Sequence, residues 1–295
     1  NRHIYVGGQK KFIPSVDDRN NASESVNMKP HSILNKFVDF NIAKKLLENI
    51  NSRGYITPTP IQDAAIAPII EGRDVIGIAE TGSGKTAAFL IPIINKLILN
   101  RNEKALIIVP TRELAVQIND EFYLLSKFLS VYSALCIGGA SINRQIFDLR
   151  KNPQIVIGTP GRLKDLFNRS FLNLKAFTIV VLDEADRMVD IGFLPEIKFI
   201  VSRLRRDRQS LFFTATSSTP VEGVINSFVK NPLKVSVKIT AAPQSIKQDI
   251  IKVKNQGEKM IKLQELLKRE EFKKVLIFGR TKHGVDRLSK KLFQL

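Results

Sequence analysis

The apolar residues of this chain occur mainly as short runs of strand length, separated by segments with helical spacing. The runs lie at residues 74–79, 105–110, 133–139, 154–159, 177–183 and 210–216. Alternating strands and helices imply right-handed crossover connections and favour a parallel sheet. Because the runs are apolar at consecutive positions, each strand is expected to carry helices on both of its faces. The sequence therefore predicts an α/β fold with a mainly parallel sheet between two layers of helices.

The same pattern divides the chain into parts. Residues 1–34 are polar and show no sustained period, so we expect a mobile basic arm. A first domain is predicted over residues 35–239, closed by a last strand-like run at 233–238. Residues 240–246 are predicted to be a linker, and residues 247–295 are predicted to begin a second, C-terminal α/β domain.

The second domain is expected to be incomplete, because about 50 residues are too few to bury the core of a parallel-sheet domain. Its expected elements are a strand, a helix, a strand and a helix, at residues 248–254, 257–270, 273–279 and from 283 onward. We therefore expect a truncated domain that stops at Leu295.

Charge and cysteine usage narrow the class of protein. Lys and Arg number 46 against 28 Asp and Glu, a formal charge of +18, which favours a polyanion partner over a merely solvated basic surface. The single cysteine, Cys136, excludes a disulfide framework and fits a reducing, cytoplasmic compartment. The longest apolar stretch, residues 89–99, is broken by Pro92 and is far shorter than a bilayer span requires, so no membrane segment is expected.

A phosphate-binding loop is the strongest local signal. Residues 80–86 read Glu-Thr-Gly-Ser-Gly-Lys-Thr, after an expected strand and before an expected helix. Gly82 and Gly84 let backbone N–H groups approach phosphate oxygens, and the helix N-terminus adds a favourable dipole. Lys85 can reach the β- and γ-phosphates, and the Thr86 hydroxyl can hold Mg²⁺. The motif therefore favours a nucleotide site over the alternative, an ordinary strand-to-helix turn.

Two acids follow a later strand. Asp183 and Glu184 stand at the end of the run 177–183, and the carboxyl ends of strands face the ligand crevice of an open α/β sheet. Asp183 can hold Mg²⁺ through water, and Glu184 can orient and deprotonate an attacking water. Alone, the pair fits equally well two solvent-facing acids at a helix start. Together with the phosphate loop, it indicates nucleotide hydrolysis.

These motifs, with others in the same order, resemble those of the DEAD-box RNA helicases. The segment IVVLDEADRM at 179–188 spells the DEAD box itself, and GYITPTPIQ at 54–62 is similar to the adenine-reading Q motif. AETGSGKT at 79–86 has the family's form of the phosphate loop, and LIFGRT at 276–281 resembles the first motif of the second domain. The resemblance runs from about residue 37 to the end of the chain. It implies a RecA-like first domain and the start of a second.

The resemblance also implies an ATP site with Mg²⁺. Its nucleotide-binding residues would be Phe37, Tyr55, Pro60, Gln62, Thr81, Gly82, Ser83, Gly84, Lys85 and Thr86. The metal ligands would be Thr86 and Asp183, and the catalytic residues Lys85, Asp183 and Glu184. Gln62 is expected to read the adenine edge through its amide. Phe37 is expected to stack on the base, and packing against the helix expected at 42–50 is the alternative.

RNA would bind through three further motifs that match the family. These are PTREL, a Gly-Gly pair and TPGR, which place RNA on Pro110, Thr111, Arg112, Gly138, Gly139, Thr159, Pro160, Gly161 and Arg162. Contacts with the sugar and phosphate carry no base information, so binding of single strands or short duplexes without sequence specificity is expected. For Arg112 and Arg162, the alternative is a surface salt bridge with a nearby acid.

A last group is expected to couple the two sites: Asp186, Thr214 and Thr216. The sequence TAT at 214–216 stands where the family usually has Ser-Ala-Thr. Because the hydroxyl is kept, Thr214 is expected to retain a hydrogen bond to Asp186.

Taken together, the resemblance implies an ATP-dependent RNA helicase that remodels RNA locally. The segments LDEADRMVDIGFLPEI and FGRTKHGVDRLSKKL are most similar to the bacterial RhlE type, which would allow ribosomal or RNA-decay complexes as partners. The alternatives are a spliceosomal-type DEAD-box helicase, a non-catalytic RNA clamp and a DNA-directed ATPase. The family's catalytic arginines belong to motifs past Leu295. Residues 1–295 alone are therefore expected to bind ATP, to hydrolyse it poorly and not to unwind RNA.

Overall fold

The computed structural model describes residues 2–6, 33–216, 219–237 and 249–294. The chain divides into two compact units, one of residues 26–240 and one of residues 1–25 together with 241–295. The linker predicted at 240–246 lies outside the described residues. Each unit is described separately below.

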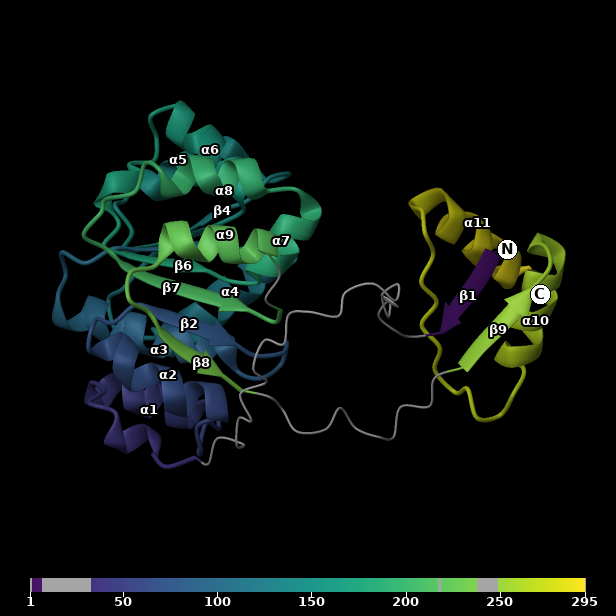
Figure 1. Ribbon diagram of the computed structural model, residues 1–295, viewed down its shortest axis with the longest axis horizontal. Helices are drawn as coiled ribbons and strands as arrows, with labels where there is room; N and C mark the ends of the chain where they lie inside the picture. The colour runs from purple at the N-terminus through teal and green to yellow at the C-terminus, as the bar shows by residue number, and fades with distance from the viewer. Residues whose placement is uncertain (1, 7–32, 217–218, 238–248, 295) are drawn as a thin grey trace, which may run out of the picture. The chain divides into compact units, whose positions relative to one another are not determined.

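The first unit is built on a sheet of seven strands, and every neighbouring pair runs parallel (Figure 1). In spatial order the strands are β4 (Ser133–Cys136), β5 (Ile155–Gly158), β3 (Ala105–Ile108), β6 (Ile179–Leu182), β7 (Gln209–Thr214), β2 (Val75–Ile78) and β8 (Leu233–Ser236). The seven runs expected from the sequence all form strands, so the predicted fold class is confirmed.

Helices cover both faces of this sheet (Figure 1). One layer holds α1 (Lys44–Ser52), α2 (Pro60–Ile70), α3 (Lys85–Leu99) and α4 (Arg112–Leu125). The other holds α5 (Ile142–Arg150), α6 (Pro160–Asn168), α7 (Ala185–Ile191), α8 (Leu194–Val201) and α9 (Thr219–Phe228). Short 3₁₀ helices lie at Phe37–Asp39 and Leu174–Ala176. No helix in the described ranges combines the length and the apolar character that a bilayer crossing requires.

Alternation along each strand feeds two separate hydrophobic cores. In β3, Ile107 belongs to the core beneath α1 to α4, whereas Leu106 and Ile108 belong to the core beneath α5 to α9. Successive side chains of a strand point to opposite faces, so a run that is apolar at every position fills both cores. This is why the predicted strands read as continuous apolar runs rather than as alternating ones.

The parallel arrangement brings the predicted motifs to one edge of the sheet. The segments that follow the carboxyl ends of β2, β3, β4, β5, β6 and β7 are 79–84, 109–112, 137–139, 159–162, 183–186 and 215–216. Ligands of open parallel sheets bind outside these ends. Motifs spread over more than 130 residues of sequence therefore face a common edge.

The second unit is small, and two expectations differ from its structure. It contains β1 (Arg2–Val6), which pairs antiparallel with β9 (Asp249–Val253), together with α10 (Gln256–Leu267) and α11 (Lys282–Phe293). Residues 2–6 of the arm expected over 1–34 form this strand, and residues 7–32 of the arm lie outside the described residues. The strand expected at 273–279 does not form, and Leu276 and Phe278 are 78% and 88% exposed. An extended segment without a neighbouring strand has no ladder to join.

We predict that replacing Gly77 by alanine destabilises the first unit. A Cβ at Gly77 would lie 2.5 Å from the ring of Phe213, which is fully buried against Phe89 with ring centroids 5.3 Å apart. Overpacking of this kind lowers the free energy of unfolding by roughly 1–3 kcal/mol, which denaturation in urea measures. Gly223→Ala is the matched control, because Gly223 lies exposed in α9 and its added Cβ meets nothing within 4 Å. Equal stability of the two variants would contradict this packing.

Candidate functional site

The turn between β2 and α3 has the backbone of a phosphate-binding loop. Gly82 and Gly84 have φ angles of +81° and +92°, a region that side chains with a Cβ rarely adopt. A Cβ at Gly84 would also lie 2.6 Å from Nε2 of Gln62, whereas one at Gly82 would meet nothing within 4 Å. The loop is therefore packed against α2 at Gly84 and open at Gly82.

Two polar groups in this loop fit an anion. The Nζ atom of Lys85 donates a buried hydrogen bond of 2.7 Å to the carbonyl oxygen of Ala79. The Oγ atom of Ser83 is buried and has no hydrogen-bond partner within the described part of the chain. Ser83 lies just before the N-terminus of α3, where unpaired N–H groups and the helix dipole favour negative charge. Thr81 is exposed and Thr86 is half-buried in the same turn. The residues present thus suit a phosphate group.

Gln62 ties α2 to the loop. Its Oε1 atom accepts from the backbone N–H of Thr59 at 2.9 Å, and its Nε2 atom donates to the carbonyl oxygen of Gly84 at 3.1 Å. Pro60 is the first residue of α2, where its missing N–H is tolerated. The amide expected to read adenine therefore has internal partners at both ends in this structure.

The two aromatic residues expected at the nucleotide pack inside the protein. Phe37 is 2% exposed and lies between Phe40 and Tyr55, with ring centroids 6.3 and 6.4 Å away. The hydroxyl of Tyr55 donates to Oε1 of Glu121 on α4 at 2.7 Å, and burial together with this carboxylate raises the pKa of Tyr55 to about 12. The structure thus favours the packing interpretation of Phe37, because its ring is buried beside these two aromatic rings.

Asp183 stands where β6 ends, and it is 2% exposed. Burial raises its pKa to about 7, the positive charge of Lys85 opposes this shift, and the negative charge of Glu184 adds to it. The backbone N–H of Glu184 donates to Oδ1 of Asp183 at 3.0 Å. A nearby cation would stabilise the charged form of a carboxyl group this buried. Within the described residues, no three His, Cys, Asp or Glu side chains could together hold a metal ion.

Glu184 has a left-handed backbone, with φ 52° and ψ 48° at the N-cap of α7. For a residue with a Cβ this conformation costs on the order of 1–3 kcal/mol and is concentrated at functional sites. Its carboxylate accepts from Nη1 of Arg187 at 3.2 Å, a contact that the motif analysis missed. The i,i+3 spacing of a carboxylate and a guanidinium on α7 was the available signal.

Asp186, Thr214 and Thr216, which were expected to couple the ATP and RNA sites, form different hydrogen bonds from those expected. Oδ2 of Asp186 accepts from the N–H groups of Ala215 and Thr216 at 3.2 and 3.0 Å, and from the Thr216 hydroxyl at 2.9 Å. The Thr214 hydroxyl, predicted to make this bond, instead donates to the carbonyl oxygen of Thr216 at 2.8 Å. Thr214 is still within β7 and fully buried, and its hydroxyl bonds to Thr216 rather than to Asp186.

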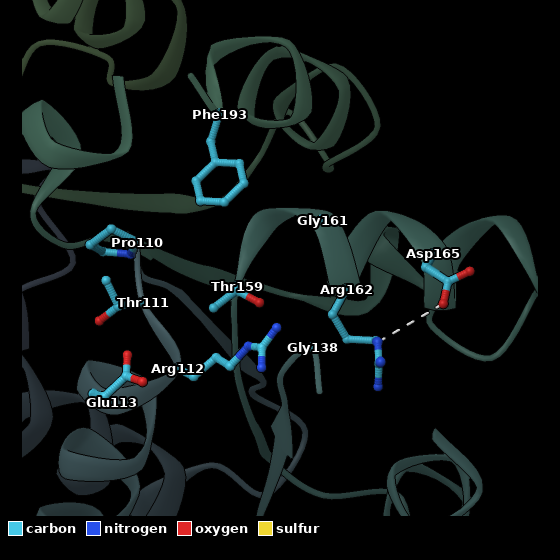
Figure 2. Close-up of a pocket in the computed structure, with 10 residues that line it drawn as sticks. All are labelled: Pro110, Thr111, Arg112, Glu113, Gly138, Thr159, Gly161, Arg162, Asp165 and Phe193. Atoms are coloured by element: carbon cyan, nitrogen blue, oxygen red, sulfur yellow. Dashed lines mark ion pairs between the residues drawn. The ribbon is translucent and has the colours of Figure 1, made fainter. Parts of the chain in front are cut away.

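A groove of about 510 Å³ lies beside these residues, at the carboxyl ends of β3, β4 and β5 (Figure 2). It is lined by Pro110, Thr111, Arg112, Glu113, Gly138, Thr159, Gly161, Arg162, Asp165 and Phe193. Seven of the nine residues expected to bind RNA are among them. Gly139 and Pro160 are not, although a Cβ at Gly139 would collide with Nη1 of Arg112. We call this hollow the Arg112 groove.

The two arginines of the Arg112 groove are held differently. Arg112 has no ion pair with any described residue, and its guanidinium lies against Gly138 and Gly139, whose missing Cβ atoms make room for it. Nη1 of Arg162 donates to the carbonyl oxygen of Ala140 at 3.3 Å, and its Nε lies 3.9 Å from Oδ2 of Asp165. Arg162 thus forms a long ion pair with Asp165, as the salt-bridge alternative expected, whereas Arg112 forms none with the described residues.

Sequence reasoning missed three residues that line the groove: Glu113, Asp165 and Phe193. Glu113 is part of the PTREL motif itself, and Asp165 lies three residues after the end of TPGR on α6, so their position in or near these motifs was the signal. Phe193 comes from the segment between α7 and α8 and projects toward Thr159 and Gly161 from the far side of the groove (Figure 2). No local pattern marks such a residue, because only the packing of α8 on α6 brings it there.

Comparison with known proteins gives relatives that agree with one another. The chain is 41% identical to the ATP-dependent RNA helicase CshA of Listeria monocytogenes, over 88% of this chain and 50% of that protein. It is 43% identical to the DEAD-box ATP-dependent RNA helicase 30 of Arabidopsis thaliana, over 87% and 45%. A DEAD box protein from the hyperthermophile Methanococcus jannaschii superposes with a TM-score of 0.67 at 35% identity, over 88% of this chain and 70% of that one.

The chain spans about half the length of the curated relatives it matches. The family model of the DEAD/DEAH box helicases matches residues 59–224, which include the phosphate loop, the two acids and the Arg112 groove. This protein therefore belongs to the DEAD/DEAH box helicase family.

Proposed function

We propose that this chain is the nucleotide-binding part of an ATP-dependent RNA helicase that remodels RNA without sequence specificity. The observation that supports this most directly is the arrangement at one sheet edge. There the loop with Lys85 and the acids at 183–184 stand beside the Arg112 groove, and Asp186 ties the acid segment to Thr216. Both proposed sites therefore lie at the same edge of the sheet.

At the nucleotide, the loop N–H groups, Ser83 and Lys85 would hold the phosphates. Thr86 and Asp183 would hold Mg²⁺, which neutralises phosphate charge when it is bound. Glu184 would orient and deprotonate the attacking water. The adenine would meet Gln62, and the residues expected to complete the pocket are Tyr55, Pro60, Thr81, Gly82 and Gly84. A stacking role for Phe37 would require a face of its ring to be uncovered.

At the Arg112 groove, the partner would be the backbone of a single strand or a short duplex of RNA. Arg112 and Arg162 would bind phosphate oxygens, and the hydroxyls of Thr111 and Thr159 would bind phosphate or sugar. Gly161 leaves its side of the groove open, since a Cβ there would meet nothing within 4 Å. None of these groups reads a base, so affinity would follow charge and salt rather than sequence.

Three finer assignments are the type of helicase, its location and its partner complexes. The bacterial RhlE type is supported by the segments around the DEAD box and at the start of the second domain, whereas bacterial and plant relatives match at similar identity. A cytoplasmic location is supported by the single cysteine, Cys136, which is free and buried. Ribosomal or RNA-decay complexes would suit a basic RNA-remodelling enzyme.

We predict that Lys85→Ala weakens the binding of ATP with Mg²⁺ by roughly 10- to 100-fold, because hydrogen bonds to charged groups contribute about 1.5–3 kcal/mol. Titration of a fluorescent ATP analogue measures it. Lys45→Ala is the control, since it removes the same charge from the exposed face of α1, where Lys45 pairs with Glu48. An unchanged affinity in Lys85→Ala, or an equal loss in both variants, would count against a phosphate site at this loop.

For RNA, we predict that Arg112→Ala lowers the affinity for single strands of any sequence and reduces the slope of log affinity against log salt by about one. Arg205→Ala is the matched control, because Arg205 precedes the amino end of β7 at the opposite edge of the sheet. Electrophoretic mobility shifts over a range of salt concentrations give both quantities. If both variants lose affinity equally, the RNA is held by general charge and not by the Arg112 groove.

A non-catalytic RNA clamp is the competing function. Glu184→Gln in the complete protein should abolish RNA-stimulated ATP hydrolysis while leaving ATP binding intact, because the amide cannot accept the proton of the attacking water. Phosphate release measures hydrolysis, and a DNA strand of the same length in place of RNA tests the DNA-directed alternative. A hydrolysis rate equal to that of the wild type would favour the clamp.

A further inference from the structure

Residues 34–43, which precede α1, are fastened at both ends by buried polar side chains. At the first end, Asp63 of α2 is 5% exposed, and its carboxylate accepts hydrogen bonds from Leu34 and Asn35. Oδ2 accepts from the backbone N–H of Leu34 at 3.1 Å, and Oδ1 accepts from the backbone N–H and the side-chain Nδ2 of Asn35 at 3.0 and 2.9 Å. We call residues 34–43 the upstream strap.

The second fastening comes from α3. Asn95 is fully buried, its Oδ1 accepts from the backbone N–H of Ala43 at 2.8 Å, and its Nδ2 donates to the carbonyl oxygen of Asn41 at 3.1 Å. Between the two fastenings, Phe37 and Phe40 are buried in the core at 2% and 4% exposure. The upstream strap is thus held by directed polar bonds at its ends and by apolar burial in its middle.

The two helices that hold the upstream strap are the two that form the nucleotide site. Gln62 stands directly before Asp63 on the first turn of α2 and donates to Gly84 of the phosphate loop. Lys85 begins α3, and α2 and α3 pack against each other. A change in the hydrogen bonds of the Asp63 carboxylate would therefore shift the first turn of α2, which positions the Gln62 amide.

We propose that Asp63 is a positioning residue of the nucleotide site, which sets ATP affinity and base selectivity by fixing the upstream strap to α2. This rests on the proposed function, in which Gln62 meets the adenine. A buried carboxylate needs its donors, so loss of the strap bonds would drive the first turn of α2 to rearrange. Gln62 lies in that turn, and its place against Gly84 would be lost with it.

The simpler interpretation is that Asp63 only stabilises the fold. Asp74 separates the two, because it is a second buried carboxylate, 9% exposed, that accepts backbone N–H bonds from Ser210 and Lys230 at 2.8 and 2.7 Å. It precedes β2, whereas the phosphate loop follows that strand, so it lies at the opposite edge of the sheet. A purely structural carboxylate would behave as Asp74 does.

The experiment compares Asp63→Asn, Asp74→Asn and Asn35→Ala in this chain. We expect Asp63→Asn to bind ATP roughly tenfold more weakly and to narrow the preference for ATP over GTP, since about 1.4 kcal/mol corresponds to a tenfold change. Asn35→Ala removes one strap bond from a half-buried position and should shift both quantities less, in the same direction. Asp74→Asn should lower thermal stability and leave both quantities unchanged. Fluorescent-nucleotide titration and thermal melting give the readouts.

Each outcome decides something. If the wild-type chain binds no nucleotide, the proposed function fails and the upstream strap has no site to position. If the wild type binds ATP while Asp63→Asn and Asn35→Ala retain its affinity and its selectivity, the inference about Asp63 is overturned. Equal effects of Asp63→Asn and Asp74→Asn on nucleotide binding would overturn it as well. If Asp63→Asn does not fold, Asn35→Ala decides alone.

Discussion

The parallel hydrogen bonding of β2, β6 and β7 is the constraint on which the rest of the structure depends. These three strands are neighbours in the sheet, so their carboxyl ends open side by side. That places the loop with Lys85, the buried Asp183 and the link through Thr216 at one edge of the sheet, although they are separated by long stretches of sequence. The hydrophobic cores on both faces stabilise this parallel sheet. Each strand can be covered by helices on both faces only if it is apolar at consecutive positions.

At that edge, several polar groups that would act on nucleotide already have a partner inside the protein. Lys85 donates to the carbonyl oxygen of Ala79, Gln62 to that of Gly84, and Glu184 accepts from Arg187. Binding would therefore exchange hydrogen bonds rather than create them, and an exchange contributes little net free energy. Asp183 differs, since burial raises its pKa to about 7 and leaves a carboxyl group that a cation would stabilise.

The sequence predicted the features that follow from local pattern. The strands of the first unit, the glycine conformations of the phosphate loop and most residues of the Arg112 groove could be found because strand periodicity and motif spacing are local. The misses depend on tertiary packing. Thr214 is turned inward by the end of β7, Phe193 reaches the groove through α8, and residues 273–279 lack a strand to pair with. The residues next to each of these positions in the sequence give no signal for them.

The upstream strap shows the same limit most clearly, and it gives that limit a physical cause. Asp63 bonds to residues 28 and 29 positions earlier, and Asn95 bonds to residues 52 and 54 positions earlier. Closing such separations costs conformational entropy that single hydrogen bonds barely offset, and the burial of Phe37 and Phe40 between the two ends helps to offset that cost. Phe37, which was expected to stack on the adenine, thus anchors the upstream strap in the hydrophobic core. The burial of Phe37 and the hydrogen bonds of Asp63 connect the strap to α2, and Asn95 connects it to α3, so contacts outside the nucleotide site link the two helices.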